Sequence, residues 1–329
     1  MRKYLRWVFW LTIIFWAGAP APRAQVDMWG INDVPMDRFA YAMDHGLGWA
    51  RIEPKWRDTE PQPGMYDFAA FDRVVEEANR LGLGLVASIG IGYSGNMPAW
   101  LRARGGIGDP QYTDYLADYL YALVRRYAGK IAFYQVENEL NHIGLEQFFL
   151  TRRREGQWTD ALVREVLEKA VDAVHRADPE ARIIINVEAD NPNWWRFLSK
   201  VTREWLIDYD VIGIDAYPNY VLPAPELGAI IGRSVARAGR DFKKPVIITE
   251  AGYSTWSLFH TETNQAIYMQ FAVQAAMQSG AIGFFYYSFR DSPGPSFAEV
   301  ELHFGLHRLD GSPKPAWEEY GRLIAEASP

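Results

Sequence analysis

Short apolar stretches alternate along this chain with longer stretches in which apolar residues recur every three to four positions. The short stretches are rich in Val, Ile and aromatic residues, which is typical of buried β-strands, and the longer ones predict amphipathic helices. Strands are predicted at residues 26–31, 49–53, 83–89, 131–137, 182–187, 210–216, 245–250 and 281–288. Helices are predicted at residues 66–81, 112–127, 159–177 and 261–279, with weaker patterns at 36–45, 193–205, 225–239 and 313–327.

Strands that alternate regularly with helices define the fold class. An α/β chain of this kind, with eight such repeats, predicts a (β/α)8 TIM barrel rather than a doubly wound sheet. No G-x-G-x-x-G sequence follows the first strand and no Walker-type phosphate loop is present, which argues against a nucleotide-binding fold. No linker or low-complexity tract divides the chain after Val26, so residues 25–329 are predicted to form a single barrel domain.

The first 24 residues differ from the rest of the chain. Arg2, Lys3 and Arg6 precede an apolar run at residues 7–16, and small residues and prolines follow at residues 17–24. This arrangement predicts a secretory signal peptide at residues 1–24. An uncleaved N-terminal anchor is the alternative. The protein is therefore expected to be secreted or periplasmic, with no integral membrane domain beyond this segment.

Charge and composition exclude several classes of function. The chain has 34 Lys and Arg against 41 Asp and Glu, and the net charge of −7 argues against a nucleic-acid partner. With no Cys, disulfides, thiolate metal sites and a Cys nucleophile are excluded. The six His residues form no H-x-H pair, and Lys55, Lys130, Lys243 and Lys244 flank strands instead of ending them. Neither a metal-dependent hydrolase nor a Schiff-base aldolase is favoured, and no metal or cofactor is expected.

Two glutamates lie where a barrel of this kind builds its active site, at the carboxyl ends of strands. Glu139 follows the fourth predicted strand and Glu250 ends the seventh. A pair of carboxyls facing each other across a pocket suits glycoside hydrolysis, because one protonates the leaving oxygen while the other attacks the sugar or activates water. From these residues alone, either glutamate could also be an ordinary surface residue at a strand end.

Further motifs make the pattern more specific. The glutamates stand in the pairs Asn138-Glu139 and Thr249-Glu250. They are accompanied by WARIEPKW at residues 49–56, EPQPGMYDF at 60–68, Phe304-Gly305-Leu306 and DGSPKPAW at 310–317. In this order along the eight strands, the set resembles the clan A glycoside hydrolases, and the resemblance spans essentially residues 26–328.

The resemblance implies roles for individual residues. Glu139 would be the general acid/base and Glu250 the nucleophile of a retaining mechanism, with carboxyl groups about 5–5.5 Å apart. Arg51 would hydrogen-bond Glu250 and keep it ionised, because a nearby cation favours the charged form. Tyr217 would donate a hydrogen bond to the same carboxylate.

Other positions are expected to contact the sugar. The resemblance implies that Asn138 holds the sugar 2-hydroxyl. It also implies that Tyr287 is the nearest equivalent of the Trp that clan members usually place on strand eight. Trp56 and Trp256 are predicted to stack on sugar rings at the mouth of the barrel. They belong to a group of tryptophans that follow strands, the others being Trp29, Trp194 and Trp195, and packing within loops is the alternative for each.

Three acidic residues remain ambiguous. Glu137 rivals Glu139, because strand alternation puts both on the same face, although the Asn-Glu pairing favours Glu139. Glu188 and Asp215, near the ends of strands five and six, could bind sugar hydroxyls or form salt bridges. The predicted function is a monomeric, secreted retaining glycosidase that cleaves β-glycosidic bonds in a poly- or oligosaccharide. The alternatives are a non-catalytic carbohydrate-binding barrel and a transglycosylase on the same framework.

Overall fold

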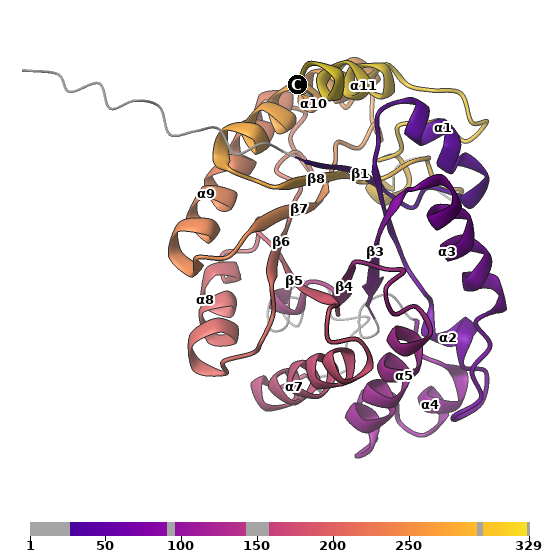
Figure 1. Ribbon diagram of the computed structural model, residues 1–329. Helices are drawn as coiled ribbons and strands as arrows, with labels where there is room; N and C mark the ends of the chain where they lie inside the picture. The colour runs from indigo at the N-terminus through magenta and orange to yellow at the C-terminus, as the bar shows by residue number, and fades with distance from the viewer. Residues whose placement is uncertain (1–26, 91–95, 143–157, 295–298, 328–329) are drawn as a thin grey trace, which may run out of the picture.

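Eight parallel strands close into a barrel in chain order, with the last strand paired to the first (Figure 1). The computed structural model describes residues 27–90, 96–142, 158–294 and 299–327. The strands are β1 (Met28–Asn32), β2 (Trp49–Ile52), β3 (Gly84–Ile89), β4 (Phe133–Val136), β5 (Arg182–Glu188), β6 (Val211–Ala216), β7 (Val246–Ala251) and β8 (Gly283–Tyr286). The predicted (β/α)8 TIM barrel is confirmed.

Helices surround the barrel on its outer face (Figure 1). The larger ones are α3 (Ala69–Leu81), α5 (Tyr112–Arg126), α7 (Asp160–Ala177), α9 (Ile231–Phe242), α10 (Glu262–Ser279) and α11 (Pro315–Ala327). Shorter helices are α1 (Phe39–Asp44), α2 (Trp56–Thr59), α4 (Ala99–Ala103) and α8 (Trp194–Ser199). Three predicted helices are split: η1 (Met36–Arg38) precedes α1, the π-helical turn η4 (Lys200–Glu204) follows α8, and η5 (Pro225–Ile230) precedes α9.

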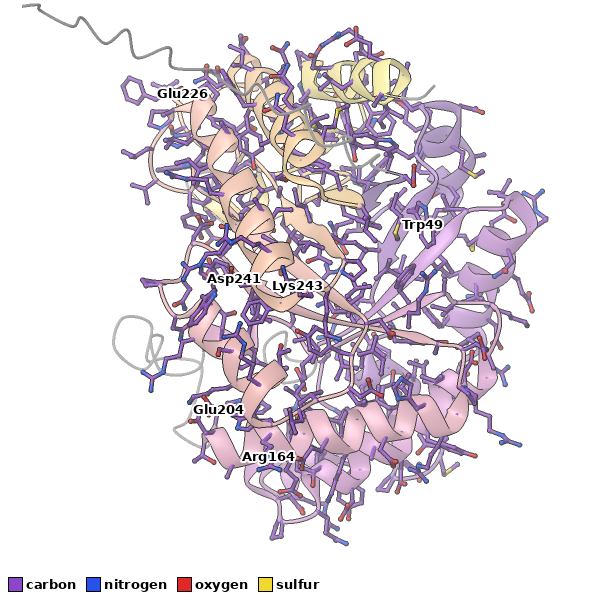
Figure 2. The ribbon with its side chains drawn as sticks, turned by 60° about the vertical axis from the view of Figure 1, so that its left-hand side comes forward. Trp49, Arg164, Glu204, Glu226, Asp241 and Lys243 are labelled. Carbon is purple, nitrogen blue, oxygen red and sulfur yellow. The ribbon has the colours of Figure 1, made fainter. Side chains whose placement is uncertain are left out.

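The sequence explains where the long helices begin and end. Thr159 and Thr261 cap α7 and α10, because each hydroxyl accepts a hydrogen bond from a backbone N–H in the first turn. Gly82 and Gly280 end α3 and α10 in the left-handed conformation, which glycine adopts without steric cost. Figure 2 shows Glu226 in η5 and Lys243 directly after α9. These two residues lie at opposite ends of the helical segment formed by η5 and α9, which leads the chain to the start of β7.

The inside of the barrel has an apolar end and a polar end. An apolar cluster fills the amino-terminal end of the strands, and it consists of Met28, Val86, Phe133, Ile184, Val211, Ile247 and Phe285, with Trp49 packed against it. Gly30 leaves the room that the Phe285 ring occupies, since a Cβ there would lie 2.3 Å from the ring. Polar side chains occupy the other end, where the strands terminate.

The predicted signal peptide at residues 1–24 lies outside the described residues. Among the helices that the structure describes, none has the length and hydropathy required to cross a bilayer.

Candidate active site

Arg51 lies at the centre of the polar end of the barrel and is only 7% exposed. Its Nε donates to Gln135 Oε1 at 2.9 Å. Its Nη1 donates to Asn32 Oδ1 and to Glu250 Oε1, at 2.7 Å each. Its Nη2 donates to Ser88 Oγ at 3.0 Å and to Asn138 Oδ1 at 3.1 Å. A guanidinium group has five N–H donors, so protein acceptors use every one of them. Arg51 therefore lies under the site and orients its side chains, without a donor left for a sugar.

Burial opposes the charge of Arg51, but the carboxylates of Glu250, Asp215 and Asp33 outweigh it and raise the pKa of Arg51 above its ordinary value. The guanidinium is thus a permanent cation beneath the mouth of the barrel.

A β-bulge in β7 brings two consecutive residues into the interior. The register of β7 shifts against both neighbouring strands in the region between Ile248 and Ala251. Thr249 Oγ1 donates to Asp215 Oδ1 at 2.5 Å, while the next residue, Glu250, meets Arg51. In a regular strand these two side chains would point to opposite faces. The bulge therefore places Glu250 at the site.

Glu250 is held by two donors. Arg51 Nη1 lies 2.7 Å from its Oε1, and the Tyr217 hydroxyl donates to Oε2 at 2.5 Å. The Glu250 side chain remains 12% exposed. The Arg51 and Tyr217 contacts expected from the sequence resemblance are both present in the structure. One carboxylate oxygen accepts from each neighbour, so the side chain is fixed in one orientation at the mouth.

Glu139 faces Glu250 from the loop after β4. One carboxylate oxygen from each of Glu139, Asp215 and Glu250 lies within 4.8 Å of the other two. The backbone of Glu139 is in the left-handed region, with φ of 48°, and its N–H donates to Asn186 Oδ1 at 3.0 Å. Burial, followed by the negative charges of Asp215 and Glu250, raises the pKa of Glu139 well above its ordinary value. The site thus favours a protonated Glu139.

Glu137 points elsewhere. Strand β4 ends at Val136, not at residue 137, and Glu137 has a left-handed φ of 60°. The prediction that Glu137 and Glu139 share a strand face was therefore wrong. Glu137 is 1% exposed and accepts a hydrogen bond from the Tyr112 hydroxyl of α5 at 3.5 Å. Glu139, not Glu137, joins Glu250.

Asn138 is anchored through its side-chain oxygen. Oδ1 accepts hydrogen bonds from Arg51 at 3.1 Å, Gln135 at 3.0 Å and Asn186 at 2.9 Å. The amide orientation is fixed by these three donors, which makes Nδ2 the group suited to meet a ligand.

Aromatic rings line the Glu250 side of the site. Tyr217 and Tyr287 meet edge to face at 6.1 Å, and Phe304 packs against Tyr217 at 5.2 Å and against Tyr287 at 5.6 Å. Tyr287, directly after β8, is half-buried. Burial of the Tyr217 hydroxyl, together with the charge of Glu250, raises the pKa of Tyr217 well above its ordinary value, so the phenol stays a donor.

Trp56 does not lie at the mouth. It is fully buried on the outer side of the barrel, where it stacks on Tyr119 at 5.1 Å and donates from Nε1 to Glu60. The prediction that Trp56 stacks on a sugar is wrong, because burial among the helices leaves no face for a ligand.

Of the other four candidate tryptophans, two are buried and two are half-buried. Trp29 and Trp194 are also buried, at 6% and 7% exposed. Trp195 is half-buried and bonds Asp241 of α9 through Nε1 at 2.9 Å. Trp256, after β7, is half-buried with its ring 5.0 Å from that of His260. Of the two proposed stacking residues, only Trp256 remains a candidate.

Sequence reasoning missed the polar residues below the glutamates. Asn32, Ser88, Gln135, Asn186 and Thr249 are all buried and bonded to Arg51, Asp215 or the loop after β4. Each interrupts an otherwise apolar strand near its carboxyl end, and this shared placement was the available signal. Asp215 is 0% exposed, which rules out the suggested contact with a sugar hydroxyl.

Three carboxyls this close could in principle hold a metal ion. Here a cation is already present, because Arg51 Nη1 lies 2.7 Å from Glu250. Thr249 and Asn186 donate to the two oxygens of Asp215, at 2.5 Å each. The carboxylate oxygens of Glu250 and Asp215 thus already accept hydrogen bonds from protein donors.

Comparison with known proteins agrees with this geometry. The model of Glycosyl hydrolase family 10 matches residues 50–208, slightly less than half of the chain. Beta-1,4-xylanase of Dictyoglomus thermophilum is 30% identical over 132 residues, which are 40% of this chain and 35% of that protein. Endo-1,4-beta-xylanase 2 of Claviceps purpurea is 31% identical over 141 residues, 42% of this chain and 40% of that protein. The chain thus aligns with well under half the length of these relatives.

Solved structures share the fold over nearly the whole chain. A family 1 β-glucosidase from Thermotoga maritima has a TM-score of 0.71 at 14% identity, and the match covers 94% of this chain and 99% of that one. An exo-β-1,4-mannosidase from an Opitutaceae bacterium, strain TAV5, has a TM-score of 0.69 at 20% identity, covering 91% and 59%. These structures share the (β/α)8 barrel with this chain, and the family model and the relatives agree with the resemblance to glycoside hydrolases expected from the sequence.

Proposed function

We propose that the protein is a retaining glycosidase that cleaves β-glycosidic bonds in a poly- or oligosaccharide. The observation that carries this proposal is the approach of the Glu139 and Glu250 carboxylates to within 4.8 Å, with Glu250 bonded to Arg51 and Tyr217. Retaining enzymes have carboxyls about 5–5.5 Å apart, whereas inverting enzymes need about 6.5–9.5 Å to accommodate a water molecule. The short separation therefore supports double displacement.

In the first step, Glu250 attacks the anomeric carbon while Glu139 gives its proton to the departing oxygen. The product is a glycosyl ester of Glu250 and a free alcohol. In the second step, Glu139, now ionised, takes a proton from water, whose oxygen attacks the anomeric carbon and releases Glu250. Arg51 and Tyr217 stabilise the Glu250 carboxylate before attack and after release, and the Nδ2 group of Asn138 donates to the sugar 2-hydroxyl.

Xylan-type substrates are the first to test, because the curated relatives carry the names of β-1,4-xylanases. The half-buried rings of Tyr287 and Trp256 are proposed to contact sugar rings on either side of the glutamates. A carbohydrate-binding barrel without catalysis is disfavoured, because both carboxyls are present and face each other. A transglycosylase would use the same two steps with a sugar in place of water.

The protein is also proposed to act outside the cytoplasm as a monomer without a metal. N-terminal sequencing of exported protein should show loss of about 24 residues. Treatment with a chelator should leave the hydrolysis rate unchanged. A loss of rate that Ca²⁺ or Zn²⁺ restores would contradict the two-carboxylate mechanism.

Azide rescue tests the roles of the two glutamates. On an activated aryl β-glycoside, Glu139→Ala should still form the glycosyl ester, because the leaving group departs without acid assistance. Azide should then attack that ester and give the β-glycosyl azide. Glu250→Ala lacks the nucleophile, so azide should take its place and give the α-glycosyl azide. Loss of general acid–base assistance is worth about 10²–10⁴-fold on a poor leaving group.

Proton NMR of the two azides decides the assignment. The opposite pair of anomers would reverse the roles of Glu139 and Glu250. Glu137→Ala is the matched control, because it removes the neighbouring buried carboxyl and should need no azide. Wild-type behaviour of Glu139→Ala on both substrate types would contradict the proposal.

A further inference from the structure

A third carboxyl lies with the two glutamates and has no part in the two steps above. Asp215, near the end of β6, is 0% exposed, and one of its oxygens lies within 4.8 Å of an oxygen from each glutamate. An unneeded carboxyl in such a position is costly, because burying a charge without compensation is strongly unfavourable. The hydrogen-bond partners of Asp215 indicate whether this carboxyl is ionised or protonated.

The neighbours of Asp215 are donors. Thr249 Oγ1 donates to Oδ1 and Asn186 Nδ2 donates to Oδ2, at 2.5 Å each. The Asn186 amide cannot be reversed, since its Oδ1 accepts the backbone N–H of Glu139 at 3.0 Å. Its NH₂ group must then face Asp215. Burial and the charge of Glu250 raise the pKa of Asp215, whereas the cation of Arg51 and the hydrogen bonds from Thr249 and Asn186 favour its charged form. Both oxygens of Asp215 are placed to accept, as an ionised carboxylate does.

Glu139 is the neighbour that can supply a further proton. A hydrogen bond joins Glu139 to Asp215, and it favours the protonated form of Glu139. Glu250 is already satisfied by Arg51 and Tyr217, so it does not compete for this proton.

We propose that Asp215 is a positioning residue that stays ionised and holds the acid proton on Glu139 by accepting a hydrogen bond from it. This inference rests on the proposed function and names how the acid form of Glu139 is maintained. The groups that face the pair are Arg51 from β2, Glu188 from β5, Tyr217 directly after β6 and Glu250 from β7. Among these, Arg51 supplies the only positive charge.

The proton balance is the same throughout the reaction. Before attack, Glu139 is neutral while Asp215 and Glu250 are ionised. After attack, the proton has left with the alcohol, Glu250 is a neutral ester and Glu139 is ionised. With the cation of Arg51 included, these groups carry one net negative charge in both states. The anion of Asp215 also makes the ionised Glu139 more basic, which helps it to remove a proton from water in the second step.

Replacing Asp215 by Asn tests this role through the pH profile. Asn keeps the size of the side chain but removes the charge, so Glu139 should lose its proton more easily. The alkaline limb of kcat/KM should move to lower pH by about one unit or more. The rate should fall more for alkyl than for activated aryl leaving groups, since only the former need the acid. An unchanged alkaline limb in a folded Asp215→Asn enzyme would overturn the inference.

A matched control separates charge from stability. Asp291 is another buried carboxyl at 8% exposed, and it pairs with Lys314 at 2.8 Å after β8, outside this group. Asp291→Asn should lower stability without moving the alkaline limb. If it moves the limb as far as Asp215→Asn does, the effect is a general consequence of destabilisation and the inference fails.

Infrared titration provides a measurement that does not require turnover. The carboxyl signal that disappears in Glu139→Gln should titrate at lower pH in the Asp215→Asn background than in the wild-type background. This shift would support the proton-holding role even if no glycoside were cleaved, and its absence would overturn that role even in an active enzyme. If Asp215→Asn does not fold, Thr249→Val removes one donor to Asp215 and leaves its carboxylate a stronger acceptor, so the Glu139 titration should move to higher pH. No movement in that variant would likewise count against the inference.

Discussion

The two ends of the barrel interior are built by the same strands but differ in the side chains that fill them, which are apolar at one end and polar at the other. On β4, Phe133 belongs to the apolar end and Gln135 to the polar end; on β5, Ile184 and Asn186 divide in the same way. Two residues along a strand span about 6.6 Å, so a single pleat separates the two environments. The same strand therefore supplies some side chains to the apolar cluster that stabilises the barrel and others to the polar site, and no side chain belongs to both.

The two ends should respond differently to substitution. Dispersion and burial stabilise the apolar end, so this end should tolerate substitutions that change the shape of a side chain but keep its volume. The polar end is a connected network in which each buried donor needs its acceptor, so loss of one member leaves others unsatisfied.

The largest effect is expected at Arg51. Arg51→Met removes the cation beside Glu250 and leaves Asn32, Ser88 and Gln135 without a donor. We expect kcat/KM to fall about 10²–10³-fold, as on removal of other preorganised electrostatic groups. The free energy of unfolding should also fall by about 3–5 kcal/mol, because a buried ionic partner is lost. Steady-state kinetics and urea unfolding measure both, and an active, stable variant would contradict the view of Arg51 as the centre of the network.

Phe133→Ala should separate stability from chemistry. Phe133 is 1% exposed in the apolar end, and its loss should lower the free energy of unfolding by about 3–5 kcal/mol. The kcat of the folded fraction should remain close to wild type, because the polar network two residues away is intact. Phe133→Leu is the milder control. A kcat that falls in proportion to stability would mean that the two ends are coupled.

Glu139→Gln should increase stability at neutral pH. Because the pKa of Glu139 is raised in the folded state, the folded protein keeps a proton that the unfolded chain releases. Stability is therefore lost as pH rises from the ordinary pKa of a glutamate through the raised one. Gln carries no titrating proton, so the variant should exceed wild type by roughly 0.5–2 kcal/mol at pH 7, a typical gain for a stabilising substitution. The difference should shrink toward pH 4 in urea titrations, and a constant difference would exclude the pKa as its cause.

The smallest effect concerns Trp56. Trp56→Phe keeps the ring stacked on Tyr119 but loses the bond to Glu60, so stability should fall by about 1 kcal/mol with KM unchanged. Trp256→Phe is the matched comparison and should raise KM, since the half-buried ring of Trp256 is the one proposed to contact a sugar. A raised KM in Trp56→Phe alone would restore its sugar-stacking role.

Much of the fold was predictable from the sequence. Every strand was located to within two residues at each end, because apolar runs bounded by helical patterns leave little ambiguity. The positions of Glu139 and Glu250 also followed, since strand ends meet at one edge of a barrel.

Other features depend on local backbone geometry that periodicity does not encode. Glu137 and Glu139 were assigned to one face because alternation was assumed to continue, whereas both residues have left-handed φ values. Trp56 was placed at the mouth because it follows β2, yet it begins the short helix α2 and turns into the layer of helices. The role of Asp215 does not follow from the sequence, because it depends on hydrogen bonds from Asn186 and Thr249 on neighbouring strands.

The bulge in β7 has a consequence for how such a site could be gained or lost. Because it inserts one extra residue into the pairing, Thr249 and Glu250 both reach the interior. A deletion of a single codon that restored regular pleating would send one of the two side chains outward, although the composition of the strand would hardly change. The geometry of the proposed active site thus depends on the length of one strand as well as on its residues.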